Sequence, residues 1–440
     1  MSGTLIVGAS QAGVQLAVSL RELGDTSAIT LVGAEAYPPY QRPPLSKEFL
    51  AGTAGPESLA FRTAAFYADA GIELVCGERV VDLALCCDGR PGSGSADLPG
   101  SGSAELPGSG SAELPGSGRA RTATGRELPF DRLALTVGAR PRRLTIPGAH
   151  LDGILYLRDV DDAEQLRTRL AGAARVVVVG GGFIGLEAAA VARAQDKHVT
   201  VVEAADRLVP RAVAPVVSEF YRQAHSRRGT DVRLATAVAG FSGRDGSVTG
   251  VLLADGTELP ADLVMVGVGV LPRTELAEQL GLECDGGIVV DAHARTSEPS
   301  VVAAGDCTVL PHPLTGEGRV RLESVHGAVH QASVAAATLV GAEVETRSVP
   351  WFWSNQGQLR LQIAGLSTGF DSFVVRGNMD EEKFSVLYYR DGELLAVDAV
   401  NNPVDYMVVR KALTQGVSIP ADRAADSSVP LKAMLAAVTA

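Results

Sequence analysis

Two stretches of the chain share one hydrophobic pattern: a short apolar run, then a glycine-rich turn, then apolar residues at helical spacing. The apolar runs are residues 4–7 and 176–179. An apolar run of about four to eight residues that is bounded by turn residues is typical of a buried strand. We therefore predict two strand–turn–helix–strand units, which are characteristic of α/β folds. The expected helices and second strands are residues 14–23, 28–32, 185–194 and 198–203.

Further apolar runs extend these two units into sheets. Residues 263–269 and 300–307 contain strand-like runs that lead into glycine turns, and both are predicted to return to a sheet. After residue 348 the pattern changes, and two strand-like segments flank Asp391-Gly392, a strong hairpin signal. The pattern thus predicts an α/β chain followed by a separate C-terminal α+β domain.

Length and composition indicate how many domains the protein has and to which broad class it belongs. A chain of 440 residues exceeds the roughly 250–300 residues at which single cores stop growing, so two or three domains are expected. A hydrophobic fraction of 46% with 20% charged residues is that of a folded protein rather than a disordered one. Five cysteines without a C-x-x-C pair argue against both a disulfide framework and a metal site.

Charge and hydropathy exclude several partners. The net charge of −12 disfavours nucleic acid and anionic membrane surfaces. No apolar run approaches the roughly 20 residues that span a bilayer. The first residues lack the charged start and the long apolar stretch of a signal peptide. We therefore expect a cytoplasmic protein.

Residues 91–118 form an eight-residue repeat of the type PGSGSAEL. Its Gly, Ser and Pro content cannot bury a core, so we expect a flexible loop inserted between strands.

The second glycine turn has the complete G-x-G-x-x-G pattern. Gly180, Gly182 and Gly185 follow a strand and open a helix, an arrangement that places a nucleotide pyrophosphate on the helix N-terminus. Glu203 ends the next strand, where a carboxylate accepts the ribose hydroxyls of NAD and repels the 2′-phosphate of NADP. Arg207 lies close enough in sequence to keep NADP as an alternative.

The first glycine turn departs from this pattern. It contains Gly8 and Gly13 but has Ser10 at the middle position, where the small side chain still permits close approach of a pyrophosphate. The acidic residue after the second strand is Glu35, which we interpret as the ribose ligand. Two dinucleotide-binding units in one chain suggest a flavin that exchanges electrons with a nicotinamide.

Eight sequence blocks in a fixed order carry a family resemblance. They are residues 8–13, RPPLSK at 42–47, GGGFIGLE at 180–187, VVEAADRLVPR at 201–211, GVGVLPRTELA at 267–277, AAGDC at 303–307, ESVHGAVHQA at 323–332 and VPWFWSNQ at 349–356. Together they resemble the FAD- and NADH-dependent ferredoxin reductases of the putidaredoxin reductase and aromatic-ring dioxygenase reductase type. The C-x-x-x-x-C redox pair of related disulfide reductases is replaced here by Pro-Pro-Leu-Ser-Lys, which disfavours that activity.

The resemblance implies a glutathione-reductase-like fold with three parts. Residues 1–144 and 271–347 would bind FAD, residues 145–270 would bind NADH, and residues 348–440 would cover the flavin. The residues that the resemblance places at the cofactors, together with those of the two motifs, are Gly8, Ser10, Ala12, Gly13, Glu35, Arg42, Lys47, Val80, Arg140, Gly180, Gly182, Gly185, Glu203, Gly267, Asp306, Val325 and Trp353.

Lys47 and Glu187 are the expected catalytic pair. Similar enzymes pair the lysine that follows the two prolines with the glutamate of G-L-E, so a buried ion pair beside the flavin is predicted. Trp351 and Trp353 either pack in a core or contact the flavin and its acceptor. His326 and His330 are interpreted as structural, because their spacing is poor evidence for a metal site.

The function that the resemblance implies is electron transfer from NADH through FAD to a [2Fe–2S] ferredoxin that serves a monooxygenase or dioxygenase. A rubredoxin reductase or NADH oxidase, and a redox-sensing flavoprotein of the apoptosis-inducing-factor kind, stay open as alternatives. The protein is expected to be a monomer or a homodimer. An acidic ferredoxin would dock on a local basic patch, for which the candidates are Arg319, Arg321, Arg410 and Lys411.

Overall fold

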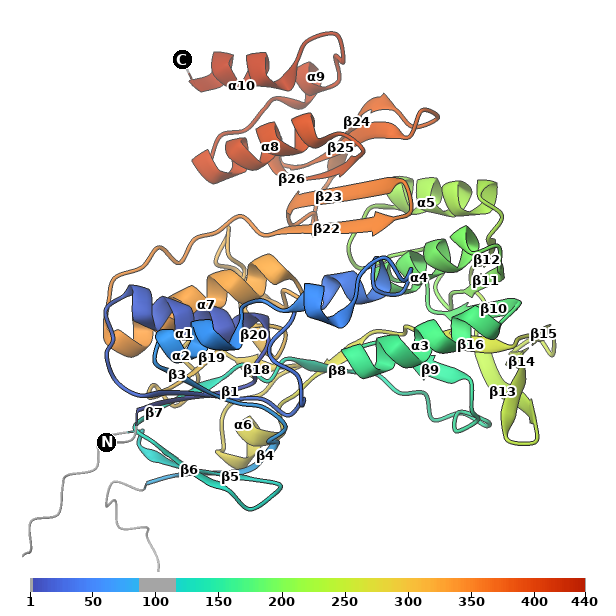
Figure 1. Cartoon of the computed structure of the whole chain (residues 1–440). Coiled ribbons are helices and arrows are strands. Elements are labelled where there is room, and N and C mark those ends of the chain that lie inside the picture. Colours follow the sequence, from blue (N-terminus) through green and yellow to red (C-terminus); the bar gives the residue numbers. More distant parts are fainter. Residues whose placement is uncertain (1–2, 87–115, 440) are drawn as a thin grey trace, which may run out of the picture.

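The computed structural model describes residues 3–86 and 116–439 (Figure 1). Most of the predicted 91–118 loop lies outside these residues, but its last part is folded. Gly118 begins strand β5 (Gly118–Thr122) and pairs with Leu85 of β4 (Val80–Leu85). The predicted end of the loop is therefore wrong, because glycine content does not distinguish a turn residue from the first residue of a strand.

A five-stranded parallel sheet carries the first glycine turn. Its strands are β19 (Val301–Ala303), β7 (Arg132–Leu135), β1 (Thr4–Val7), β2 (Ile29–Val32) and β3 (Ile72–Val75), in that order. Val7 pairs with Val32 on one side and with Leu135 on the other, so the central strands end together at one edge. Helices α1 (Gln11–Glu22) and α7 (Val325–Val340) contact each other on one face of this sheet (Figure 1).

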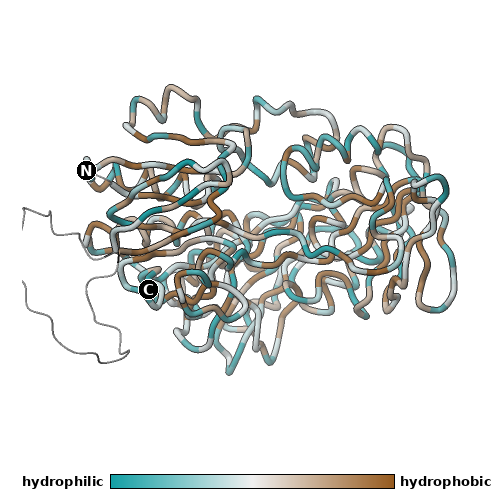
Figure 2. Tube along the Cα trace, turned by 90° about the horizontal axis from the view of Figure 1, so that it is seen from below, coloured by the Kyte–Doolittle hydropathy of each residue, from teal (hydrophilic) through white to brown (hydrophobic). Residues whose placement is uncertain are grey.

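Successive residues of β1 enter two different cores, as the two-residue period of a strand requires. Ile6 packs with Leu16 and other apolar residues of the helical face. Leu5 packs on the opposite side with Phe130, which belongs to an antiparallel meander of β4, β5 and β6 (Glu127–Phe130). Figure 2 shows hydrophobic stretches, in brown, along the backbone trace near the N-terminus. The uniform apolar pattern of the strand thus reflects burial on both faces.

A second five-stranded parallel sheet carries the second glycine turn. Its order is β12 (Asp231–Arg233), β11 (His198–Val202), β10 (Arg175–Val179), β16 (Leu263–Val266) and β9 (Ile154–Tyr156). One face packs on helices α3 (Val160–Gly172), α4 (Phe183–Ala194) and α5 (Pro215–Arg227). The other face packs on a small antiparallel sheet of β13 (Val238–Arg244), β14 (Ser247–Leu253) and β15 (Glu258–Pro260).

The two parallel sheets are joined by two chain crossings that pair with each other. Strand β8 (Ala139–Pro141) leaves the first sheet and β17 (Val270–Pro272) returns to it, and they form a two-stranded antiparallel sheet (Figure 1). The predicted strands at 263–269 and 300–307 are confirmed as β16 and β19. The remaining short elements are η1 (Pro43–Ser46), η2 (Pro56–Leu59), α2 (Ala64–Asp69), α6 (Glu275–Gln279), β18 (Ile288–Val289), β20 (Thr308–Pro311) and β21 (Arg319–Val320).

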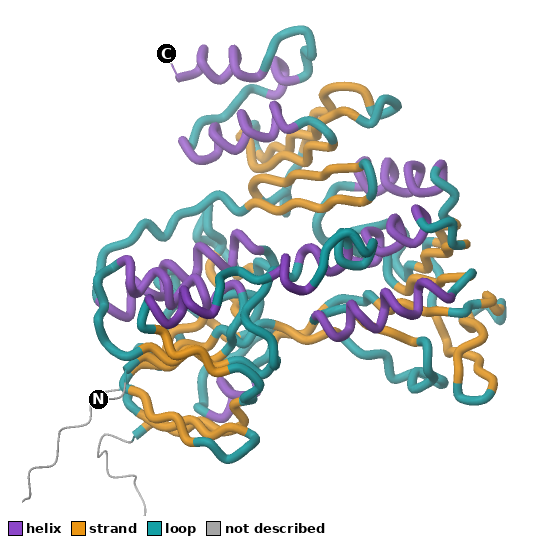
Figure 3. The backbone as a smooth tube through the Cα atoms, in the orientation of Figure 1, coloured by secondary structure: helices purple, strands orange, loops and turns teal. Residues whose placement is uncertain are grey.

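The C-terminal part is an antiparallel sheet with helices, as the change of pattern after residue 348 predicts (Figure 3). Its strands and helices are β22 (Trp351–Gln356), β23 (Leu359–Gly365), β26 (Glu393–Val400), β25 (Lys383–Arg390), β24 (Ser372–Asn378), α8 (Pro403–Gln415), α9 (Ala421–Ala424) and α10 (Leu431–Thr439). The predicted hairpin is confirmed: Asp391 and Gly392 have φ angles of 52° and 80°, as a tight turn with two left-handed residues requires.

Within the described ranges, no helix combines the length and the apolar character that crossing a membrane requires.

A buried carboxyl group lies where the C-terminal sheet meets the second parallel sheet. Asp398 of β26 is 0% exposed and accepts a hydrogen bond from the hydroxyl of Tyr388. Tyr388 in turn accepts from the backbone N–H of Ala214, which precedes α5. The second carboxyl oxygen of Asp398 has no partner among the described residues. Burial raises the pKa of Asp398 to about 7.

This shift predicts that stability falls as the pH rises. The folded chain holds the Asp398 proton up to about pH 7, whereas the unfolded chain loses it near pH 3.8. The free energy of unfolding therefore falls across this window, and linkage puts the loss at about 4 kcal/mol. Asp398→Asn keeps the acceptor and removes the proton, so its stability relative to the parent should rise by about 3 kcal/mol between pH 5 and pH 8.

Urea denaturation at the two pH values measures this difference. Asp380→Asn is the matched control, because Asp380 is exposed. A stability difference between Asp398→Asn and the parent that is the same at both pH values contradicts the interpretation.

Candidate functional site

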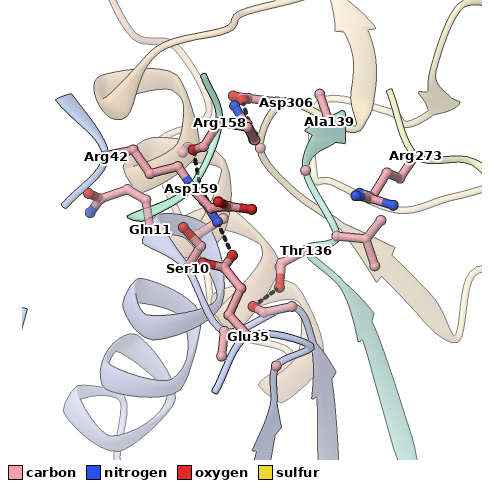
Figure 4. A pocket seen from close by; sticks show the side chains of 18 of the residues that line it. Ser10, Gln11, Glu35, Arg42, Thr136, Ala139, Arg158, Asp159, Arg273 and Asp306 are labelled. Atoms are coloured by element: carbon pink, nitrogen blue, oxygen red, sulfur yellow. Dashed lines mark hydrogen bonds and ion pairs between the residues drawn. The ribbon is translucent and has the colours of Figure 1, made fainter. Parts of the chain in front are cut away.

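A cavity of about 610 Å³ lies at the edge where β1 and β2 end. Its wall includes the turn after β1, the η1 loop and the β8 crossing (Figure 4). The start of α4 and strand β22 complete it. All three predicted parts of the chain thus contribute residues to one cavity. Its volume lies within the roughly 300–1,000 Å³ that is usual for ligand sites.

The first glycine turn brings the N-terminus of α1 to this cavity. Helix α1 begins at Gln11, three residues before the predicted start, because Ser10 is the N-cap and the last part of the motif already forms the first turn. The side chain of Ser10 caps no backbone N–H group. A helix start with free N–H groups binds anions such as a pyrophosphate.

Close packing explains the two glycines that flank this turn. A Cβ atom on Gly13 would lie 2.0 Å from the carbonyl oxygen of Gly8. A Cβ on Gly8 would lie 2.2 Å from the carbonyl oxygen of Thr136, and its φ of 118° also requires glycine. The hydroxyl of Thr136 donates to the Gly8 carbonyl at 2.8 Å. These contacts hold the backbone in a cradle open toward the cavity.

Glu35 reaches the cavity from the end of β2 and is held by two donors. The hydroxyl of Tyr40 and the guanidinium of Arg42 both donate to its carboxylate. Arg42 also donates to the carbonyl of Arg158 at 2.6 Å, which ties the proline-rich loop to the start of α3. A fixed carboxylate at the end of the second strand is suited to binding ribose hydroxyls.

Lys47 and Glu187 form a buried ion pair in the cavity wall. The Nζ of Lys47 lies 2.8 Å from Glu187 Oε2, and the two side chains are 12% and 4% exposed. Ser46 also donates to Oε2, and Ser354 donates to Oε1 at 2.7 Å. The sequence prediction of a buried pair is confirmed by this geometry.

The hydrogen bonds continue from Glu187 into the interior. Gln356 Nε2 donates to Ser354 Oγ at 3.3 Å, and its Oε1 lies 2.8 Å from His225 Nε2. Because an amide oxygen only accepts, His225 must donate through Nε2. The hydrogen bonds therefore run in one direction, from His225 of α5 through β22 to the Glu187 carboxylate. Nothing in the sequence spacing predicts this series of hydrogen bonds.

Most of the other predicted flavin-site residues also lie in the wall. They are Gly8, Ser10, Ala12, Glu35, Arg42, Lys47, Val80, Asp306, Val325 and Trp353. Asp306 is paired with Arg158 at 3.3 Å. Gly13 and Arg140 are not part of the wall: Gly13 packs behind the turn on the Gly8 carbonyl, and the guanidinium of Arg140 points to Glu275 at 3.4 Å with both side chains about half exposed. Arg273 lines the cavity instead, and the sequence analysis missed it.

The second glycine turn adjoins the same cavity. Helix α4 begins at Phe183, and its residues Phe183 and Ile184 belong to the wall. A Cβ on Gly185 would lie 2.4 Å from the Gly180 carbonyl oxygen, and one on Gly180 would lie 2.4 Å from that of Gly267. The two turns therefore have the same tight construction.

Glu203 and Arg207 have separate environments. Glu203 follows β11 directly and accepts hydrogen bonds from the N–H groups of Gly181 at 2.6 Å and Ala205 at 2.8 Å. Arg207 donates to the carbonyls of Val213 and Pro210, so its guanidinium is engaged by its own loop.

Aromatic side chains extend from the cavity toward α8. Trp353 lines the cavity, Trp351 lies 5.5 Å from it between ring centroids, and Arg410 lies over the Trp351 ring at 5.1 Å. His326 packs on Trp351, and burial lowers its pKa to about 4. His326 is thus neutral near pH 7. No group of three potential metal ligands occurs in the described parts of the chain.

Comparisons with known proteins agree with this construction. Residues 3–332 match the pyridine nucleotide-disulphide oxidoreductase family, and residues 351–435 match the reductase C-terminal family. Rhodocoxin reductase of Rhodococcus erythropolis is 42% identical over 98% of this chain and 94% of its own length. Putidaredoxin reductase of Pseudomonas putida is 40% identical over 99% of this chain and 97% of its own.

A solved structure gives the same result for the fold. The reductase in a covalent putidaredoxin reductase–putidaredoxin complex superposes with a TM-score of 0.89 and 38% identity, covering 100% of this chain and 99% of the other. The family implies a flavin and a nicotinamide nucleotide as cofactors. The chain therefore belongs to the pyridine nucleotide-disulphide oxidoreductases, and within them to the ferredoxin reductases of the putidaredoxin reductase type.

Proposed function

We propose that this protein transfers electrons from NADH through FAD to a [2Fe–2S] ferredoxin that serves an oxygenase. The observation that carries the proposal is that the first glycine turn and the start of the helix after the second one line one cavity, with the Lys47–Glu187 pair in its wall. Bound there, FAD would accept a hydride from NADH and release electrons singly to the acceptor. The relatives named above include reductases of small redox proteins, which supports an acceptor of this class.

The first site fits FAD by its shape and its polar groups. The start of α1 would hold the pyrophosphate, the Glu35 carboxylate would accept the ribose hydroxyls, and Asp306 would face the ribitol. Val80, Val325 and the ring of Trp353 would complete the apolar surface. Arg140 lies outside the wall in this structure and pairs with Glu275.

The second site fits NADH better than NADPH. The two hydrogen bonds that Glu203 accepts fix its carboxylate beside the turn of Gly180, Gly182 and Gly185. A 2′-phosphate would meet this negative charge. Arg207 does not compensate, because its guanidinium is engaged by backbone carbonyls.

Lys47 and Glu187 would fix the charge and the position of the ammonium group beside the flavin. Glu187 lies at the first turns of the helix that adjoins the NADH site, and Lys47 lies in the η1 loop of the FAD site. Their ion pair thus sets the separation of the two sites. Proximity and orientation of this kind are what hydride transfer needs from the protein.

Arg410 and Lys411 are the remaining candidates for docking an acidic ferredoxin. Arg319 already pairs with Glu283 at 3.0 Å and Asp285 at 3.6 Å, so it presents no net positive charge. Arg321 pairs with Glu323. Arg410 lies over Trp351, close to the cavity edge, and Lys411 is exposed on α8.

The acceptor is tested with an acidic [2Fe–2S] ferredoxin and cytochrome c. The parent should reduce cytochrome through the ferredoxin, with a rate that falls as salt is added. Arg410→Glu with Lys411→Glu should slow this rate and weaken its salt dependence, while NADH-dependent ferricyanide reduction stays unchanged as the control. Ferricyanide reduction without any ferredoxin reduction would contradict the proposed acceptor.

The ion pair is tested by a double-mutant cycle on unfolding free energy. Either Glu187→Gln or Lys47→Met alone leaves a buried group without its partner. Each single variant should therefore lower the free energy of unfolding by about 3 kcal/mol. The double variant removes both charges and should lose clearly less than the sum of the two. Additive losses would show that the two side chains do not act as a pair.

Cofactor preference is tested at Glu203. Glu203→Ala should reduce the preference for NADH over NADPH by about 1–3 kcal/mol, measured as the ratio of the two kcat/KM values, because it removes a charged acceptor and a repulsion. Asp206→Ala, in the same loop and exposed, is the matched control. If Glu203→Ala and the control have the same ratio as the parent, Glu203 does not select the nucleotide.

A further inference from the structure

The cationic side chains of the cavity wall fall into a paired and an unpaired group. Five cationic side chains line the cavity: Arg42, Lys47, Arg79, Arg158 and Arg273. Three of them contact carboxylates that also line it, at Glu35, Glu187 and Asp306. Arg79 and Arg273 have no side-chain hydrogen bond or ion pair with any residue in the described ranges.

The other acidic residues of the wall are engaged elsewhere. Glu78 accepts from Thr124, Glu275 pairs with Arg140, and Glu323 pairs with Arg321. Asp159 accepts from the Asp162 backbone N–H as the N-cap of α3. Arg273 therefore forms no ion pair with a carboxylate in the described ranges, although the charge of Glu275 acts on it, and burial of a guanidinium without a direct partner is costly.

The backbone places Arg273 firmly in the wall. It follows β17 directly, and its N–H group donates to the carbonyl of Gly138 at 3.0 Å. The side chain is half-buried, and Figure 4 shows it beside Thr136 and Ala139, with Ser10 and Gln11 on the other side of the cavity. A ligand that enters the cradle after β1 would thus lie between the start of α1 and this guanidinium.

Three guanidinium groups and one carboxylate act on Arg273. Burial, followed by the charges of Arg79, Arg158 and Arg140, lowers its pKa, and the Glu275 carboxylate opposes this shift. Guanidinium groups beside the free N–H groups of a helix N-terminus form an environment for a phosphate-bearing anion.

We propose that Arg273 binds the pyrophosphate of the dinucleotide in this cavity. This inference rests on the proposed FAD site, and it names the residue that supplies the positive charge there. An arginine fits because its planar donors can contact two phosphate oxygens at once, which a lysine cannot reproduce.

The experiment compares two probes, ADP and adenosine, on the full chain from which the flavin has been removed. Only ADP carries the pyrophosphate. In Arg273→Gln, ADP affinity should fall about 10–100-fold, the range for losing a hydrogen bond to a charged group, while adenosine affinity stays within about twofold. Arg273→Lys should recover part of the ADP affinity. Arg169→Gln is the matched control, because Arg169 pairs with Asp152 on the surface outside the cavity.

The outcomes separate this inference from the proposed function. If the parent chain binds neither ADP nor FAD, the FAD site itself is wrong. If the parent binds both and Arg273→Gln binds ADP equally well, only the role of Arg273 is overturned. Equal losses for ADP and adenosine would also overturn it, because Arg273 would then contact the base or support the fold rather than the phosphates.

Discussion

The carboxylate of Glu187 is the point on which the three parts of the molecule converge. It accepts hydrogen bonds from Ser46 and Lys47 of the η1 loop and from Ser354 of β22, while its own backbone belongs to α4. A buried carboxylate is tolerated when donors surround it and is costly when they are removed. The relative placement of the two nucleotide sites and the C-terminal sheet therefore depends on keeping this one charge satisfied.

The need to supply donors to the buried Glu187 carboxylate explains why β22 carries polar side chains as well as aromatic ones. Ser354 and Gln356 are buried and continue the hydrogen bonds from Glu187 to His225. Phe352 also lines the cavity and lies 4.7 Å from Phe183 of α4 between ring centroids. Polar contacts thus fix the strand, and the aromatic residues on it form the cavity wall. Fully satisfied buried networks of this type favour a single arrangement of the parts they join.

The sequence pattern predicts the elements well where local rules decide the structure. The strands before both glycine turns, the hairpin at Asp391-Gly392 and the α/β class follow from apolar periodicity and turn chemistry. The helix starts were placed too late, because the motif itself forms the first turn. The Lys47–Glu187 pair came from the family resemblance rather than from spacing.

Other features of the site depend on how distant segments meet. Arg140 lies on β8 and Arg273 directly follows its pairing partner β17, and only the three-dimensional arrangement shows which of them enters the wall. The hydrogen bond between His225 of α5 and Gln356 of β22 joins residues more than a hundred positions apart. No motif encodes such contacts, because they arise from the packing of whole elements.

We propose above all that a flavin and a nicotinamide nucleotide meet in one cavity of this chain. Anaerobic titration of the purified protein with NADH, followed by its visible absorbance, tests this most directly. The account predicts a yellow protein whose flavin absorbance is bleached by an equimolar amount of NADH. A folded protein that cannot take up a flavin, or a bound flavin that NADH does not bleach, would contradict it.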